Sequence, residues 1–101
     1  MDYKGKRWKK LRAYILKRDG YRCQYESRYG RNRQADTVHH IFPVDVFPEY
    51  AYEKWNLISL SRKGHERMHM RETHKLSPTG LHLLRRTATK YNIDYDEGRL
   101  L

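Results

Sequence analysis

The chain has 101 residues, enough for one small domain around a single modest hydrophobic core. Lysine and arginine number 22 against 12 acidic residues; the formal net charge of +10 favours a polyanionic partner such as nucleic acid. No run approaches the ~18 apolar residues of a membrane-spanning helix, and the single cysteine, Cys23, excludes an intrachain disulfide and a thiolate zinc cluster.

The first expected element is a helix over residues 5–18. Trp8, Leu11 and Ile15 are three and four positions apart, so they share one helix face while lysine and arginine cover the others. Asp19 and Gly20 then form a natural stop. Residues 21–36 are polar and aromatic, and we expect an irregular loop there with room for one short strand.

The middle of the chain predicts two short strands. Residues 37–41 are rich in β-branched and apolar side chains, and residues 56–60 read NLISL. A loop bracketed by Pro43 and Pro48 separates them, and its apolar residues should pack back over the core.

Two further helices are expected after the strands. Ser61 is a suitable N-cap for a helix over residues 62–74, and Ser77-Pro78 begins another with proline at its first position. The apolar face of this last helix is formed by Leu81, Leu84, Ala88 and Tyr91. Residues 92–101 hold several acids and are expected to form a loose tail.

The histidines carry the strongest chemical signal. His65 and His69 are four apart on an expected helix, the spacing at which two imidazoles of one helix bind a metal. An isolated pair of this kind is more often two surface histidines, but His39 on the neighbouring strand would complete a three-ligand site with open positions, as in catalytic metal centres. On a regular strand His39 and His40 point to opposite faces. Both can serve one site only if the strand is strongly twisted or ends there, so we expect irregular backbone at this point.

Three segments in order, VHHIFP at 38–43, WNL at 55–57 and GHERMH at 64–69, resemble the His-Asn-His (HNH) endonuclease motif. The residues that name the motif would be His40, Asn56 and His65, and the resemblance covers roughly residues 8–70. It implies a single α+β domain with a ββα-metal (His-Me finger) core at about residues 37–72, flanked by N- and C-terminal helices. The implied relatives are small phage and bacterial enzymes.

The resemblance also implies a role for each site residue. His40 would be the general base that takes a proton from the attacking water, which suits an unperturbed pKa of about 6.5. His39, His65 and His69 would bind one divalent metal ion, Mg²⁺, Mn²⁺, Ni²⁺ or Zn²⁺. Asn56 would steady the loop between the strands so that His40 keeps its orientation; the alternative is an ordinary turn or β-bulge asparagine.

The chain departs from the family at a structural zinc site. Many relatives hold that zinc with two CxxC pairs, whose positions here are occupied by Cys23 and Glu26 and by Ser61 and Gly64. We therefore expect no structural zinc. Other side chains must tie residues 21–36 to the helix, and the candidates are Tyr21, Tyr25, Tyr29 and the basic residues among them.

The leading expectation is a metal-dependent endonuclease that nicks or cuts duplex DNA with little sequence specificity. The resemblance implies a role in phage genome processing or beside the packaging machinery, and the lone cysteine fits a cytoplasmic setting, that of the host for a phage protein. The alternatives are a non-catalytic nucleic-acid-binding module of the same fold and a zinc-stabilised structural protein. The side chains expected to grip DNA phosphates, or else to form solvated surface, are Lys9, Lys10, Arg12, Arg28, Arg31, Arg33, Arg62 and Lys63.

Overall fold

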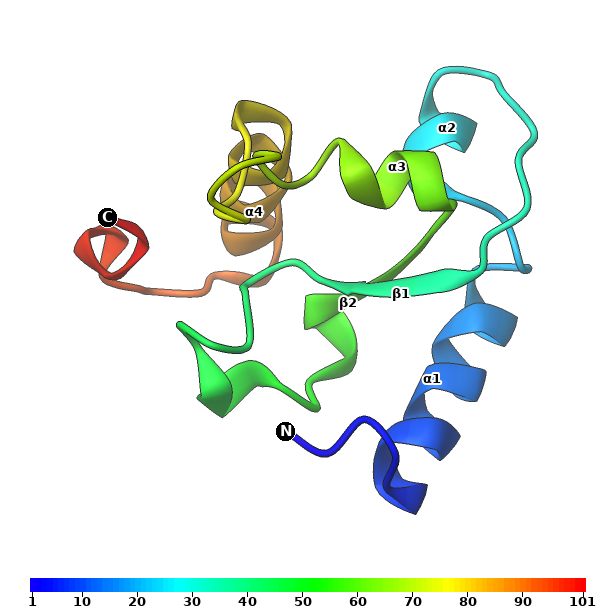
Figure 1. The fold of residues 1–101 in the computed structure, drawn as a ribbon, viewed down its shortest axis with the longest axis horizontal. Coiled ribbons are helices and arrows are strands. Elements are labelled where there is room, and N and C mark those ends of the chain that lie inside the picture. The colour runs from blue at the N-terminus through cyan, green and yellow to red at the C-terminus, as the bar shows by residue number, and fades with distance from the viewer.

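The computed structural model describes residues 1–101 and has an α+β architecture (Figure 1). Two strands pair at the centre and four helices surround them. In chain order the elements are α1 (Lys6–Arg18), α2 (Gln24–Arg28), β1 (Thr37–His40), β2 (Leu57–Leu60), α3 (Arg62–Glu66) and α4 (Pro78–Tyr91). Short 3₁₀ turns occur at Pro48–Tyr50, Lys54–Asn56 and Glu97–Leu100. No helix combines the length and the apolar character needed to cross a membrane.

The strands β1 and β2 are antiparallel, with Thr37 opposite Leu60 and His40 opposite Leu57. Directly opposed residues share a face of the sheet and neighbours along a strand alternate. His39 therefore lies on one face of the sheet and His40 on the other. Figure 1 shows α3 and α1 on opposite sides of the strand pair, so each histidine meets a different helix.

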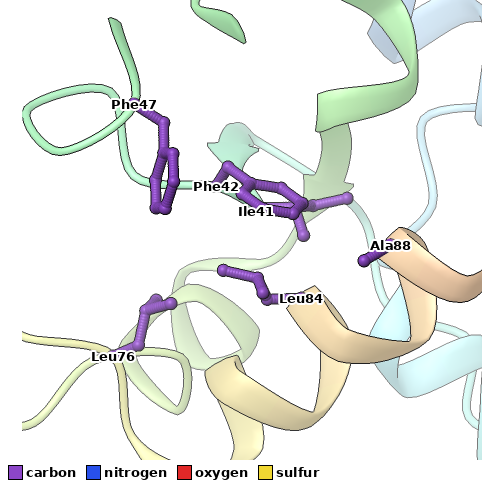
Figure 2. Packing of buried hydrophobic residues seen from close by; sticks show 6 residues of the cluster. All are labelled: Ile41, Phe42, Phe47, Leu76, Leu84 and Ala88. Atoms are coloured by element: carbon purple, nitrogen blue, oxygen red, sulfur yellow. The ribbon is translucent and has the colours of Figure 1, made fainter. Parts of the chain in front are cut away.

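Both faces of the sheet contribute to buried clusters. On the α1 side, Trp8 and Ile15 pack against Leu57. The largest cluster lies where the chain leaves β1 and meets α4 (Figure 2). Its members are Ile41, Phe42, Phe47, Leu76, Leu84 and Ala88. The loop between the strands is therefore anchored to α4 through its aromatic side chains.

The outer edge of β2 is covered by the end of α1. The backbone N–H of Ser59 donates to the Asp19 carboxylate at 2.9 Å, and the Arg18 guanidinium donates to the carbonyl of Leu57 at 2.7 Å. These side chains satisfy groups that a third strand would otherwise pair. They also fix α1 against the sheet.

The helix expected over residues 62–74 is shorter than predicted, because α3 ends at Glu66. The next residues turn back so that Met68 enters the core beside Leu60, where it is 1% exposed. His69 then forms a bridge with Leu76. Burying Met68 overrides the local helical tendency, and His69 lies beyond the helix, in the short bridge with Leu76.

Two other segments differ from the sequence expectation. Residues 24–28, expected to be irregular, form α2. The segment after α4, expected to be loose, packs Ile93, Tyr95 and Leu100 against the large core. Arg99 fastens it further, since its guanidinium donates to the Glu49 carboxylate at 2.7 Å.

Candidate active site

Three imidazoles converge between β1 and the α3 region. The ring centroids of His39 and His65 are 5.1 Å apart, those of His39 and His69 are 5.3 Å apart, and those of His65 and His69 are 5.0 Å apart. One ring nitrogen from each residue lies within 4.8 Å of the other two. A single cation could contact all three nitrogens after small side-chain adjustments.

His39 shows why a cation fits this position. Its side chain is 2% exposed, and its Nε2 is buried without a hydrogen-bond partner in the protein. Leaving a buried polar nitrogen unpaired costs free energy, and a metal ligated by that lone pair would remove the cost. Burial, with the nearby His65 and His69, lowers the pKa of His39 well below its usual range, so the ring is held neutral, as a ligand must be.

The other two imidazoles are also prepared for ligation. The carbonyl oxygen of His74 can only accept, so His69 donates its Nδ1–H to it at 3.0 Å and keeps the Nε2 lone pair free. Such an outer hydrogen bond fixes the tautomer and orientation of a metal-binding histidine. Burial, followed by the neighbouring His69, lowers the pKa of His65. Three imidazole ligands suit several divalent transition metals and leave coordination positions open.

His40 faces the α1 side and has a different set of contacts. Its Nε2 lies 3.0 Å from the carbonyl oxygen of Ala51, so Nε2 carries the proton and Nδ1 carries the lone pair. Trp8 and Tyr3 cover the ring, and burial lowers its pKa, opposed by the hydrogen bond to Ala51. The strand is regular through His40, so the irregular backbone expected here is not found; instead the strand ends directly after His40.

Asn56 ties together the two ends of the loop that supports His40. Its Oδ1 accepts from the backbone N–H of Phe42 at 2.6 Å, and its Nδ2 donates to the carbonyls of Phe42 and Tyr50, each at 3.1 Å. Asn56 is fully buried. Because Tyr50 directly precedes Ala51, this network fixes the backbone next to the carbonyl that orients His40.

The fold is shared with a nuclease of known structure. No protein-family model and no curated protein matches the sequence. Among solved structures, the HNH endonuclease of the deep-sea thermophilic bacteriophage GVE2, crystallised with manganese ion, is 31% identical. The match covers 64% of this chain and 71% of that one, with a TM-score of 0.63. The chain belongs to the HNH endonuclease family. The expected ββα-metal fold is thereby confirmed, and the similarity supports a nuclease function.

In this HNH domain, close packing occupies the positions at which the sequence comparison predicted no structural zinc, Cys23, Glu26, Ser61 and Gly64. The N–H of Gly64 donates to Ser61 Oγ at 3.0 Å, and a Cβ at Gly64 would lie 2.9 Å from Cys23 Sγ. Glu26 is 3% exposed and pairs with Arg31 at 3.0 Å. Residues 21–36 are thus joined to α3 by direct contact of Cys23 with Gly64, whose N–H is held by Ser61.

The tyrosines expected to make that connection do so only in part. Tyr25 packs against the cluster of Cys23, Leu60 and Met68, but Tyr21 and Tyr29 are exposed. The close approach of Cys23 to Gly64 was not predicted from the sequence. The available signal was a glycine in the first turn of a helix, where only a close approach would favour it.

The basic residues expected at a DNA interface of the HNH domain fall into two groups. Arg12 donates to the carbonyl of Asp36 at 2.7 Å, Arg31 pairs with Glu26, and Arg62 lies 3.5 Å from Glu66. These three already have protein partners. The remaining side chains are exposed on α1, α2, α3 and the loop after α2, and they are Lys9, Lys10, Arg28, Arg33 and Lys63.

Proposed function

We propose that this chain is a metal-dependent DNA endonuclease that hydrolyses phosphodiester bonds. The observation that carries the proposal is the convergence of His39, His65 and His69 around an unpartnered buried nitrogen. His40 lies next to His39 in the chain with a free Nδ1. Membership of the HNH family supports the same activity.

In this proposal His39, His65 and His69 hold one divalent ion, with Mg²⁺, Mn²⁺, Ni²⁺ and Zn²⁺ as candidates. The ion would supply positive charge that stabilises the negative charge developing on the phosphate. Three protein ligands leave room for a phosphate oxygen. The protein's own contribution here is to favour the neutral form of His39 and His65 by burial and to orient His69 through the carbonyl of His74.

His40 serves as the general base. Its Nε2 proton is committed to the carbonyl of Ala51, so Nδ1 accepts the proton of the attacking water. The lowered pKa keeps this ring unprotonated, and therefore able to act, at neutral pH. Asn56 acts through the loop by holding Phe42 and Tyr50, and it is a positioning residue.

The proposed substrate is duplex DNA, bound mainly through its phosphates and with little sequence specificity. The net charge of +10 and the exposed cations of α1, α2 and α3 support this. Binding should weaken with salt at a slope of about −0.9 per phosphate neutralised. We also propose a role in phage genome processing in the host cytoplasm, beside the packaging machinery, because the structurally similar enzyme comes from a phage.

Nicking of supercoiled plasmid tests the proposal. The wild type should nick with Mn²⁺, Mg²⁺, Ni²⁺ or Zn²⁺ and stop with EDTA, and His40→Ala should lose about 10²–10⁴-fold in rate. His74→Asn is the matched control, because it removes an exposed imidazole while asparagine tolerates the left-handed backbone there. A folded His40→Ala that nicks at the wild-type rate would refute the base assignment. DNA binding without any cleavage would favour the non-catalytic module.

A further inference from the structure

A groove runs between α4 and β2, apart from the histidine cluster. It consists of two hollows of about 750 and 320 Å³. Both are lined by Gln24, Ile58, His82, Leu83 and Arg86, so they are two ends of one channel. None of the four histidines assigned to catalysis lines either hollow.

The floor and ends of the groove are apolar and aromatic. Ile58 and Leu83 form the shared floor. One end carries Trp55 and Tyr91, with ring centroids 6.2 Å apart, and the other carries Tyr25 and Tyr29, 5.2 Å apart. Tyr29 and Tyr91 are 59% and 46% exposed, so part of each ring is open to a ligand, and Lys90 Nζ lies 5.3 Å from the centre of the Tyr91 ring.

The walls of the groove are cationic. Arg28, Arg86 and Lys90 are exposed and make no ion pair. Asp19 is the only acid in the lining, and Arg18 and the Ser59 N–H already occupy its carboxylate. The walls therefore present unpaired positive charge above an apolar floor.

The α4 wall has a regular spacing. His82, Arg86 and Lys90 are each four residues apart on the helix, so they lie along one face at intervals of about 6 Å. Arg86 and Lys90 thus place two cations at this interval, which can follow neighbouring negative charges of an extended chain, and His82 extends the row with a polar ring.

We propose that this groove binds a single-stranded stretch of nucleic acid. Phosphates would contact Arg28, Arg86 and Lys90, while bases would stack on Tyr29 and Tyr91, the combination typical of single-strand sites. In a duplex the base faces are stacked on one another, so a duplex could contact the cations of the groove but could not stack on Tyr29 or Tyr91. An acidic peptide would likewise leave the aromatic ends unused. This proposal rests on the proposed function in one respect, that the ligand is a nucleic acid. Binding in the groove needs neither metal nor cleavage.

Fluorescence anisotropy in EDTA tests this with a labelled oligothymidylate of about 15 nucleotides and a blunt duplex of equal length. The double variant Arg86→Gln/Lys90→Gln should raise the Kd for the single strand by about tenfold or more. Lys17→Gln/Lys75→Gln removes the same charge from exposed positions outside the groove and is the matched control. The control should weaken both oligonucleotides similarly and by less.

The aromatic ends provide a second, charge-neutral test. Tyr29→Ala and Tyr91→Ala should each weaken single-strand binding by roughly fivefold or more while leaving the duplex Kd unchanged. Equal losses for single strand and duplex in the arginine–lysine variant, or no effect of either tyrosine, would overturn the proposal. If His40→Ala loses nicking but still binds the single strand, only catalysis is affected. The groove proposal and the nuclease proposal can therefore be refuted independently.

Discussion

The indole of Trp8 stacks on the imidazole of His40, with ring centroids 5.1 Å apart and planes inclined by 18°. Tyr3 meets both rings edge-on, at 5.5 Å from Trp8 and 6.3 Å from His40. The proposed base is thus held by an aromatic face on one side and by the Ala51 carbonyl at its Nε2. Because Trp8 belongs to α1, the N-terminal helix contributes directly to the orientation of the site.

Trp8→Leu should slow plasmid nicking by about 10–100-fold with little change in KM, because a misplaced base affects the chemical step more than binding. Trp8→Phe keeps an aromatic face and should retain most of the rate. Single-turnover nicking with saturating enzyme measures the effect, and thermal melts confirm that both variants fold. If the leucine and phenylalanine variants cut equally fast, stacking on His40 has no catalytic consequence.

Asn56→Asp should destabilise the fold by about 2–4 kcal/mol, because it replaces the Nδ2 donor by an oxygen facing the carbonyls of Phe42 and Tyr50. Urea unfolding at pH 7.5 measures the change. Asn32→Asp makes the same chemical change at an exposed position and should alter the free energy of unfolding by less than about 0.5 kcal/mol. Comparable effects at the two positions would contradict the role given to Asn56.

Metal binding should stabilise the protein through the three imidazoles. Mn²⁺ at 100 times its Kd would add about 2.7 kcal/mol, which corresponds to a rise in Tm of about 10–20 °C for a domain of this size. His69→Ala should lose this response, whereas His74→Asn should keep it because the carbonyl that orients His69 belongs to the backbone. A full metal-induced rise in His69→Ala would place the ion elsewhere.

The metal-free protein should lose stability as pH falls below about 6.5, the ordinary histidine value. Burial lowers the pKa values of His39, His40 and His65 in the folded state, so below this pH the unfolded chain binds protons that the folded chain does not. Stability is complete above pH 6.5 and declines toward the lowered values. Urea unfolding in EDTA at pH 7.5 and 5.5 measures this, and a pH-independent free energy would contradict it.

Elements defined by local signals were predicted well from the sequence. The first turns of α3 and α4 are capped by Ser61 and Ser77, whose hydroxyls accept from the N–H groups of Gly64 and Gly80. The spacing of Trp8 and Ile15 identified the buried face of α1. Each of these features depends on residues a few positions apart, which a sequence displays directly.

Features that depend on distant contacts were not predicted. The docking of the C-terminal segment depends on Arg99 meeting Glu49, fifty positions away. The early end of α3 depends on Met68 finding a core site beside Leu60. The same holds at the candidate site, where the spacing of histidines suggested the cluster, but the stacking of Trp8 on His40 has no local signature.

Gly64→Ala tests the close packing of Gly64 against Cys23. A Cβ there would lie 2.9 Å from Cys23 Sγ and 3.3 Å from Ser61 Oγ, both within the buried interior. Overpacking should reduce the free energy of unfolding by about 1–3 kcal/mol, although alanine is the better helix former. In a Cys23→Ala background the same substitution should cost much less, since the sulfur is gone, and a double-mutant cycle by urea unfolding measures the coupling. Additive effects of the two substitutions would mean that Cys23 and Gly64 do not constrain each other and that α2 is joined to α3 by other contacts.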